Sequence, residues 1–340
     1  MRIGTDENSG TGTALLNREI LFTGGIRTFL LRRSREQTLQ WLDMVYSVIP
    51  DLSKRWCIRS LLPNQFSRYG LVLHARTETL GNVILKFIPG FVGRFERELE
   101  AMRILPKSYM CQLIDVVEDA GCMVLKEIVP ASYASFGETK KLNTFFSHVI
   151  RDAVPWADAM HLRYIPDYYD ELTEKIRSCD TMPYGREQIR PELIEAAELY
   201  WKVFRNARRY VLHGDLHENN ILDDGRRFYG IDPNGMLGPV ELECVRFIRN
   251  DVRNHPDIGF EQRFEILLRH FSRFVDLSRL LDSFIIDMAF CTYNSVFENE
   301  DPKETLDDLE LIRIAKEWKK RAELRSVCIH RSGSPGLSER

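Results

Sequence analysis

Three polar side chains, Asp215, Asn220 and Asp232, follow one another in the order that phosphoryl transfer from a magnesium-bound nucleotide requires. Asp215 comes directly after the short apolar segment Tyr210-Val-Leu212 and the sequence His213-Gly214. A carboxylate at the end of a strand can accept the proton of an attacking hydroxyl and hold that hydroxyl in line. The amide oxygen of Asn220, five residues later, is a hard neutral ligand suited to Mg2+.

A hairpin is predicted between the two expected metal ligands. Asp223-Asp-Gly225 is a strong turn signal between Asn220-Ile-Leu222 and Phe228-Tyr-Gly-Ile231. Because the turn is centred near Gly225, Asp232 should return to the end of the hairpin from which Asn220 left. Asp and Asn are also favoured in ordinary turns. Here the spacing, the hairpin and the second aspartate agree, which favours the functional interpretation.

The two histidines of this segment, His213 and His217, have two interpretations. Either could transfer a proton, since imidazole titrates near neutral pH. We favour the other role, in which they support the loop backbone through hydrogen bonds.

The surrounding chain predicts a small β-rich region followed by a larger helical one. Expected strands and helices of the first region are helix 37–49, strands 69–75 and 82–88, helix 92–105, and strands 111–117 and 122–128. A linker at 130–137 precedes mainly helical stretches at 140–206 and 256–327. We therefore expect an α+β, bilobal, protein-kinase-like fold. Its parts are an N-terminal extension (1–36, partly disordered), a nucleotide-binding lobe (37–129), a catalytic and substrate-binding lobe (130–330) and a disordered tail (331–340).

The nucleotide side is predicted from Lys86, which lies inside the apolar strand Val83-Ile-Leu-Lys-Phe-Ile88. A buried ammonium is costly unless it meets an anion, and phosphate oxygens held with help from a helix carboxylate would supply one. Glu98 is the expected carboxylate among Glu96, Glu98 and Glu100, although a solvated helix face and a snorkelling lysine are the alternatives.

Two further nucleotide contacts are expected from the chain around these strands. The main-chain groups of Glu127 to Val129, where the chain passes between the lobes, could bind adenine. A phosphate-covering loop is expected at 64–70, where Ser67 or backbone amides could contact phosphate.

Composition excludes several classes of protein. The 340 residues are 44% hydrophobic and 29% charged, which is typical of a folded globular chain. A net charge of −3 argues against a nucleic-acid partner. With no apolar run of membrane-spanning length and no signal-peptide pattern, we expect no membrane association and a cytoplasmic location. Seven scattered cysteines suggest neither disulfides nor a zinc site.

The motif His213-Gly-Asp-Leu-His-x-x-Asn220, followed by Ile231-Asp-Pro-x-Gly235, resembles the aminoglycoside phosphotransferase superfamily. Within it, Tyr69-Gly-Leu-Val-Leu-His-Ala75 and Val124-Leu-Lys-Glu127 are similar to the streptomycin kinase and hydroxyurea phosphotransferase branch. The resemblance covers roughly residues 37–325. It implies ATP and Mg2+ as cofactors, Asp215 as catalytic base, Asn220 and Asp232 as metal ligands, and Lys86 with Glu98 as the phosphate-orienting pair. Antibiotic inactivation by phosphorylation of a hydroxyl is the implied outcome.

Two departures from the family pattern affect the substrate. Asn234 stands where the family commonly has lysine, and Gly238 is followed by proline where an aspartate is usual. Glu243 can replace the last acid of that pattern, which braces the site loops. Neither departure removes a catalytic group, but both weaken streptomycin as the particular substrate.

Three hypotheses for function remain open. The first is an aminoglycoside-type antibiotic kinase, whose polycationic substrate needs an acidic site. The second is a metabolic kinase for an amino alcohol, amino acid or sugar, and the third is a nucleotide-binding regulator without catalysis. Acids that could line the site, unless they are ordinary solvated faces, are Asp152, Asp158, Asp167, Asp170, Glu171, Glu298 and Asp301. Aromatics that could stack on a sugar, unless they are core residues, are Trp156, Tyr164, Tyr168 and Tyr169. The oligomeric state is not predicted.

Overall fold

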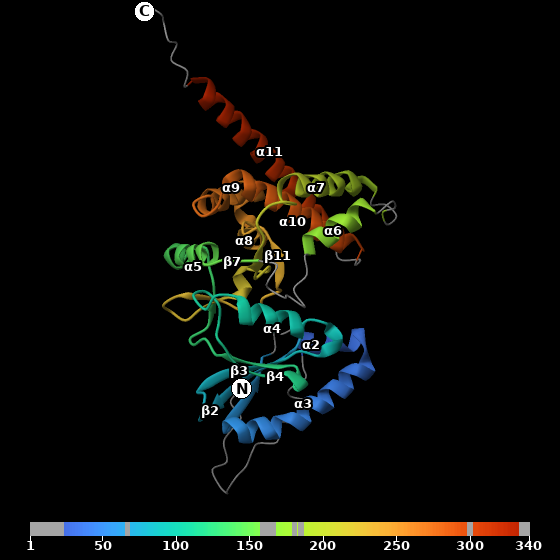
Figure 1. Ribbon diagram of the computed structural model, residues 1–340, viewed down its shortest axis with the longest axis vertical. Coiled ribbons are helices and arrows are strands. Elements are labelled where there is room, and N and C mark those ends of the chain that lie inside the picture. Colours follow the sequence, from blue (N-terminus) through green and yellow to red (C-terminus); the bar gives the residue numbers. More distant parts are fainter. Residues whose placement is uncertain are drawn as a thin grey trace, which may run out of the picture. The chain divides into compact units, whose positions relative to one another are not determined.

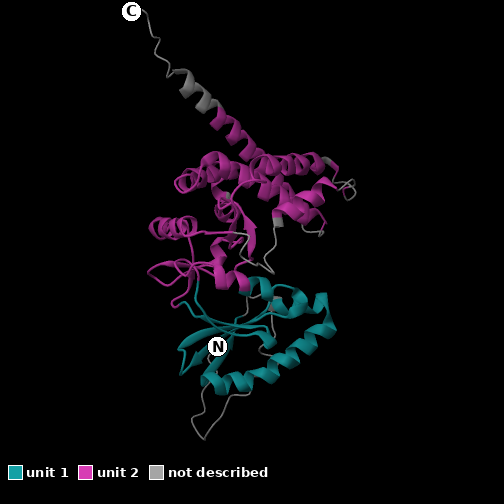
Figure 2. Ribbon diagram, in the orientation of Figure 1, with its two compact units in different colours: residues 1–99, 111–128 teal, residues 100–110, 129–340 magenta. Residues whose placement is uncertain are grey.

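The computed structural model describes residues 24–64, 69–156, 168–178, 182, 187–297 and 302–332. The chain forms two compact units (Figure 2). The first comprises residues 1–99 and 111–128, and the second comprises residues 100–110 and 129–340. The predicted order of a β-rich region and then a helical region is confirmed.

The first unit is built on a five-stranded antiparallel sheet with the order β1-β2-β3-β5-β4. Its strands are β1 (Ile58–Pro63), β2 (Leu71–Thr77), β3 (Asn82–Phe87), β4 (Leu113–Val117) and β5 (Cys122–Lys126). The predicted strands 69–75 and 82–88 correspond to β2 and β3, which pair in antiparallel fashion with Val72 opposite Lys86. Lys86 therefore lies on the central strand of this sheet, with β2 on one side and β5 on the other.

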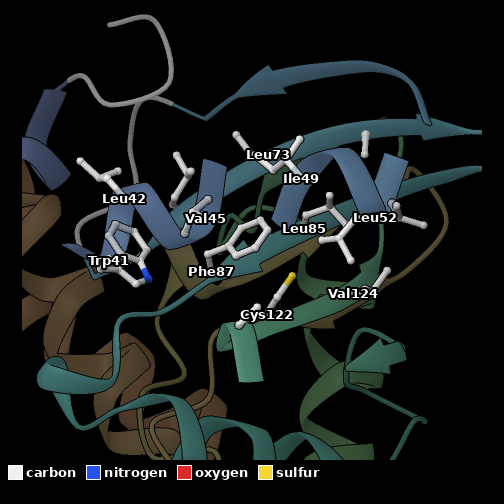
Figure 3. Close-up of a cluster of buried hydrophobic side chains, with 14 of the residues drawn as sticks. Trp41, Leu42, Val45, Ile49, Leu52, Leu73, Leu85, Phe87, Cys122 and Val124 are labelled. Atoms are coloured by element: carbon white, nitrogen blue, oxygen red, sulfur yellow. The ribbon is translucent and has the colours of Figure 1, made fainter. Parts of the chain in front are cut away.

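Helix α3 (Arg35–Trp56) covers one face of this sheet (Figure 3). Its buried side chains recur at helical spacing, at Trp41, Leu42, Val45, Ile49 and Leu52. They pack with sheet residues that include Leu73, Leu85, Phe87, Cys122 and Val124. The helix is longer than predicted because Pro50 does not end it, and it stops at Cys57 in the left-handed conformation (φ 50°). Leu39 is 48% exposed although its spacing from Leu42 fits the apolar face of a helix, whereas Trp41 is buried.

The last part of the predicted N-terminal extension is helical. Residues Gly24–Arg33 form helix α2, and its Ile26 and Leu30 belong to the core of the first unit. The sequence signal was weak because four arginines (27, 32, 33 and 35) surround only a few apolar residues. Residues 1–23 lie outside the described part of the chain.

The two units are not divided at a single point of the chain, because residues 100–110 belong to the second unit and residues 111–128 to the first. Helix α4 (Phe95–Ile104), which carries Glu98, begins in the first unit, but residues 100–110 group with the second. Leu99, Met102 and Leu105 are buried, as the predicted apolar face requires. The predicted tail begins near the end of helix α11, and residues 333–340 lie outside the described part.

The second unit is mainly helical (Figure 1). Its helices are α5 (Thr139–Arg151), α6 (Tyr168–Arg177), α7 (Arg190–Val203), α8 (Leu242–Asn254), α9 (Phe260–Phe271), α10 (Leu277–Phe297) and α11 (Pro302–Ser332). Helix α10 is buried along most of its length and packs against α7, α8 and α11. In the described part of the chain, no helix combines the length and apolar character that crossing a membrane requires.

Two small antiparallel sheets carry the polar motif of the second unit. One has the order β10-β9-β6, with β6 (Ser132–Tyr133), β9 (Ile221–Asp223) and β10 (Phe228–Gly230). The other has the order β11-β8-β7, with β7 (Val154–Pro155), β8 (Tyr210–Leu212) and β11 (Met236–Gly238). The predicted linker at 130–137 therefore contributes a short strand to the β9–β10 hairpin.

Candidate active site

Strand β8 delivers the chain to the loop that carries Asp215, as predicted. Gly214 has φ +75°, in the left-handed region that favours glycine. A Cβ atom on this residue would lie 2.7 Å from side-chain atoms of Met236 on β11. Both the backbone conformation and the packing therefore require glycine just before Asp215.

Glu243, at the start of α8, holds this loop from inside the unit. Its Oε1 accepts the His213 N–H at 2.6 Å, and its Oε2 accepts the Gly214 N–H at 3.1 Å. Burial raises the pKa of Glu243 to about 7, although the two backbone N–H groups act in the opposite direction. The negative charge of Asp215 raises this pKa further. Glu243 thus supports the loop through hydrogen bonds, as the sequence predicted.

The Asp215 side chain is about one-third exposed, at 31%, so its carboxylate can meet a small molecule. Asn220 Nδ2 donates to the Asp215 main-chain oxygen at 3.0 Å and to Oδ2 at 3.3 Å. These bonds fix the carboxylate relative to Asn220. They also turn the amide so that its Oδ1 is the atom left to bind a cation.

His213 and His217 both support the backbone, which agrees with the favoured interpretation. His213 Nε2 donates to the Ile231 carbonyl at 2.8 Å, and its Nδ1 accepts the Asp215 N–H at 3.3 Å. His217 Nδ1 accepts the Asn219 N–H at 3.2 Å. Burial lowers the pKa of His217 despite the nearby charge of Asp215. His217 is therefore neutral at physiological pH.

The β9–β10 hairpin has the predicted register. Asp223 lies opposite Phe228 and Ile221 opposite Gly230, and the Ile231 N–H donates to the Asn220 carbonyl at 2.9 Å. Asp232 therefore follows directly on the residue that pairs with Asn220. Its φ of 58° lies in the left-handed region, which Asp tolerates better than most residues.

The donor set of this hairpin end fits a magnesium ion. One amide oxygen and one carboxylate are hard oxygen ligands, and Mg2+ commonly takes one or two protein ligands and completes its shell with water and phosphate. Among the described residues, no group of three or more His, Cys, Asp or Glu side chains is placed to hold a metal ion. Asn220 and Asp232 are thus the residues here that suit the ion.

In the first unit, Lys86 and Glu98 form the expected ion pair. Lys86 Nζ donates to Glu98 Oε1, and the two residues are 5% and 1% exposed. A charge pair this deeply buried is costly to desolvate, so it is retained only with good geometry or for a function. The alternatives of a snorkelling lysine and a solvated Glu98 are excluded by this burial.

Hydrogen bonding of Glu127 inside the protein limits which of its main-chain groups could contact adenine. The Glu127 N–H donates to the Asn82 carbonyl at 3.3 Å, and its side chain bonds His74 Nδ1 at 2.6 Å. Only the carbonyl of Glu127 therefore remains for a nucleotide. Val129 is exposed, so its main chain can serve. Ser67 of the predicted phosphate-covering loop lies outside the described residues.

Of the acids expected to bind a polycation, Asp152 and Asp170 are bonded to partners inside the protein. Asp152 bonds Arg151 and His148, and its Arg151 bond lowers the pKa of Asp152 most. Asp170 accepts from Tyr200 and Arg209, each at 2.6 Å. Glu171 is exposed. The remaining acids (158, 167, 298 and 301) lie outside the described residues.

The aromatic residues that could stack on a sugar differ in burial. Tyr169 is a core residue, since it is buried and stacks on Tyr200 with ring centroids 6.1 Å apart. Trp156 is half-buried, and its main-chain N–H donates to the Arg209 carbonyl. Tyr164 and the side chain of Tyr168 lie outside the described part.

Sequence reasoning missed Arg246 and Asp287. Arg246 Nη2 donates to Asp287 Oδ1 at 3.1 Å, and the Arg246 charge interacts with Asp215. The available signal was helical spacing, because Arg246 follows Glu243 by three residues and so shares its helix face.

No protein-family model and no curated protein matches this sequence. Solved structures do match. A complex of aminoglycoside phosphotransferase APH(4)-Ia, a thermostable mutant with ADP and hygromycin B, is 12% identical with a TM-score of 0.56, covering 79% of this chain and 98% of its own. Choline kinase LicA from Streptococcus pneumoniae is 14% identical with a TM-score of 0.56, covering 81% and 99%.

A third match is a choline/ethanolamine kinase family protein from Mesorhizobium loti, 14% identical with a TM-score of 0.50, covering 76% of this chain and 87% of its own. At these identities the similarity establishes the fold. The predicted bilobal kinase-like fold is confirmed, and the streptomycin kinase branch stays a prediction.

Proposed function

We propose that this protein is an ATP-dependent O-phosphotransferase that phosphorylates a hydroxyl group of a small molecule. The observation that carries the proposal is the set of Asp215, Asn220 and Asp232. A braced loop and a hairpin of matching register hold these residues at one end of the β9–β10 hairpin. The similar folds of an aminoglycoside phosphotransferase solved with ADP and of a choline kinase support it.

Asp215 acts as the catalytic base in this proposal. Its carboxylate accepts the proton of the acceptor hydroxyl, whose oxygen forms the new bond to phosphorus as the bond to the leaving ADP breaks. Asn220 holds the carboxylate in place through Nδ2 and would bind the cation through Oδ1 together with Asp232. The magnesium ion, when bound, neutralises charge on the phosphate oxygens.

Lys86 orients the nucleotide phosphates, and Glu98 holds the Lys86 ammonium in place. The carbonyl of Glu127 and the main chain of Val129 would contact adenine. Because the reaction consumes ATP, the cytoplasm is the proposed compartment, with no nucleic-acid or membrane partner.

The acceptor has two hypotheses. An aminoglycoside-type antibiotic is the first, and the APH(4)-Ia complex with hygromycin B supports it. A metabolic acceptor is the second, and the choline kinase structure supports it equally. The ion pairs of Asp152 and Asp170 favour the second, because a polycation needs carboxylates that are not already neutralised.

A coupled assay of ATP consumption over a panel of acceptors tests the function. The panel contains aminoglycosides, hydroxyurea, choline, homoserine, glycerate and sugar amines, with Asp215→Asn beside the wild type. Asp257→Asn is the matched control, since Asp257 is an exposed aspartate outside the proposed site. Acceptor-dependent turnover that is lost in Asp215→Asn and kept in Asp257→Asn supports the proposal. Turnover that is equal in both variants refutes it.

A further inference from the structure

Helix α8 runs along the catalytic loop and touches it at two places. Near its start, Glu243 accepts from the His213 and Gly214 N–H groups, and at its end, Asn254 Nδ2 donates to Glu218 Oε1. Between them lie Arg246 and Asn250, spaced by three and four residues as one helix face requires. The α8 face that follows the catalytic loop therefore carries Arg246 between two residues that contact this loop.

Arg246 supplies positive charge at this place. Burial acts to lower the pKa of Arg246, but the charge of Asp287, with smaller contributions that include Asp215, raises it well above its ordinary value. Arg246 is thus a permanent cation on the helix face that follows the loop of Asp215.

The partner of Arg246 lies on the inner side. The Arg246 side chain is 19% exposed, whereas that of Asp287, on the adjacent helix α10 (Figure 1), is 1% exposed. The Asp287 carboxylate is thus enclosed, whereas part of the Arg246 side chain reaches the surface and its buried Nε has no hydrogen-bond partner among the described residues.

Asp287 also accepts fewer hydrogen bonds from Arg246 than Asp308 accepts from Arg249. Tyr169 donates to Asp287 Oδ1 at 2.7 Å, and Arg246 reaches the same oxygen at 3.1 Å. By contrast, Arg249, one turn further along α8, bonds both oxygens of Asp308 at 3.2 Å. A guanidinium has five N–H donors, so the single bond between Arg246 and Asp287 leaves donors that suit a second anion.

We propose that Arg246 selects the acceptor by binding a carboxylate on the small molecule whose hydroxyl Asp215 activates. This inference rests on the proposed function. A guanidinium binds carboxylates through charge-assisted, often paired hydrogen bonds, which fix orientation as well as add affinity. A polycationic acceptor would meet repulsion at the same place. The substrate class is therefore a hydroxy acid, sugar acid or hydroxy amino acid.

The test compares acceptors that differ only in the anionic group. Phosphorylation by the full-length protein is measured for glycerate against glycerol, for 4-hydroxybutyrate against 1,4-butanediol, and for homoserine against homoserinol, with kanamycin and choline as cations. Variants are Arg246→Met, Arg246→Lys and, as matched control, Arg249→Met. The double variant Arg246→Met/Asp287→Leu removes both buried charges and separates a binding effect from misfolding.

We expect at least one carboxylate-bearing acceptor to be used about 10-fold or more better than its neutral partner. Arg246→Met and the double variant should raise its KM by roughly 10- to 100-fold with a smaller change in kcat, and Arg246→Lys should restore part of the loss. Arg249→Met should leave KM within about twofold.

Other results overturn the inference and leave the proposed function standing. One is Asp215-dependent turnover confined to neutral or cationic acceptors. Another is an Arg246→Met variant that lowers kcat for every acceptor at unchanged KM, which would assign Arg246 to the transferred phosphoryl group. Failure of the proposed function is seen differently, as turnover that survives Asp215→Asn.

Discussion

The two units treat their functional charges in opposite ways. In the first unit, Lys86 and Glu98 are both buried and neutralise each other within the sheet and helix α4. In the second unit, Asp215 is partly exposed, and the buried group is its support, Glu243. A group that only orients phosphate can be fixed by a partner, whereas a base must reach the acceptor. The position of Lys86 in the first unit therefore depends on its ion pair, and the position of Asp215 in the second unit depends on a rigid loop backbone.

Breaking the Lys86–Glu98 pair should have the largest effect on stability. Lys86→Met removes the ammonium that bonds the buried Glu98 carboxylate, which should lower the free energy of unfolding by about 3–5 kcal/mol. Urea denaturation measures the change. The variant Lys86→Met/Glu98→Leu should recover most of the stability but no activity. A stable and active single variant would show that the pair is dispensable.

Removing the base should have a large effect on rate and a small one on stability, which is the reverse pattern. Asp215→Asn should lower kcat by roughly 100-fold or more, because proton acceptance in the transition state is lost. The melting temperature should change by no more than a few degrees, since Asp215 is partly exposed. Steady-state kinetics and calorimetry on the same preparation check both. A large fall in melting temperature would mean that Asp215 is structural.

Glu243 should make stability depend on pH. Its pKa is raised in the fold to about 7 from 4.5, so the folded state holds a proton that the unfolded state has released. Stability is therefore full below pH 4.5 and falls as pH rises towards 7, by roughly 3 kcal/mol from this group. Glu243→Gln should remove this fall. The measurement is urea denaturation of both proteins between pH 4.5 and 7.5, and parallel curves would contradict it.

The smallest expected effect comes from the backbone of the catalytic loop. Gly214→Ala places a Cβ against Met236 at a positive φ, which should cost about 2 kcal/mol. Gly81→Ala is the matched control, because its φ is +74° but a Cβ there meets nothing within 4 Å. The difference between the two in urea denaturation isolates the contact with Met236. Equal losses would leave only the backbone conformation as the cause.

Local patterns predicted much of the fold and of the site. The β2–β3 pair, the face of α4 and the β9–β10 register follow from alternation, helical spacing and a strong turn signal, each of which involves neighbours along the chain. Helix α2 was missed because its two core residues, Ile26 and Leu30, are stabilised by distant partners in the first unit. Leu39, which has helical spacing with Leu42, is nevertheless exposed because the sheet, and not the helix itself, decides which side of α3 is covered.

By itself, the sequence determined the order of the elements, the residue types of the site and the spacing that returns Asp232 to Asn220. Those properties depend on covalent connection and short-range geometry. Only the tertiary structure decided that Glu243 accepts from the loop N–H groups, that Asp152 and Asp170 are already paired, and that Arg246 bonds Asp287. Such charges act through space, so their partners are settled by packing between distant segments.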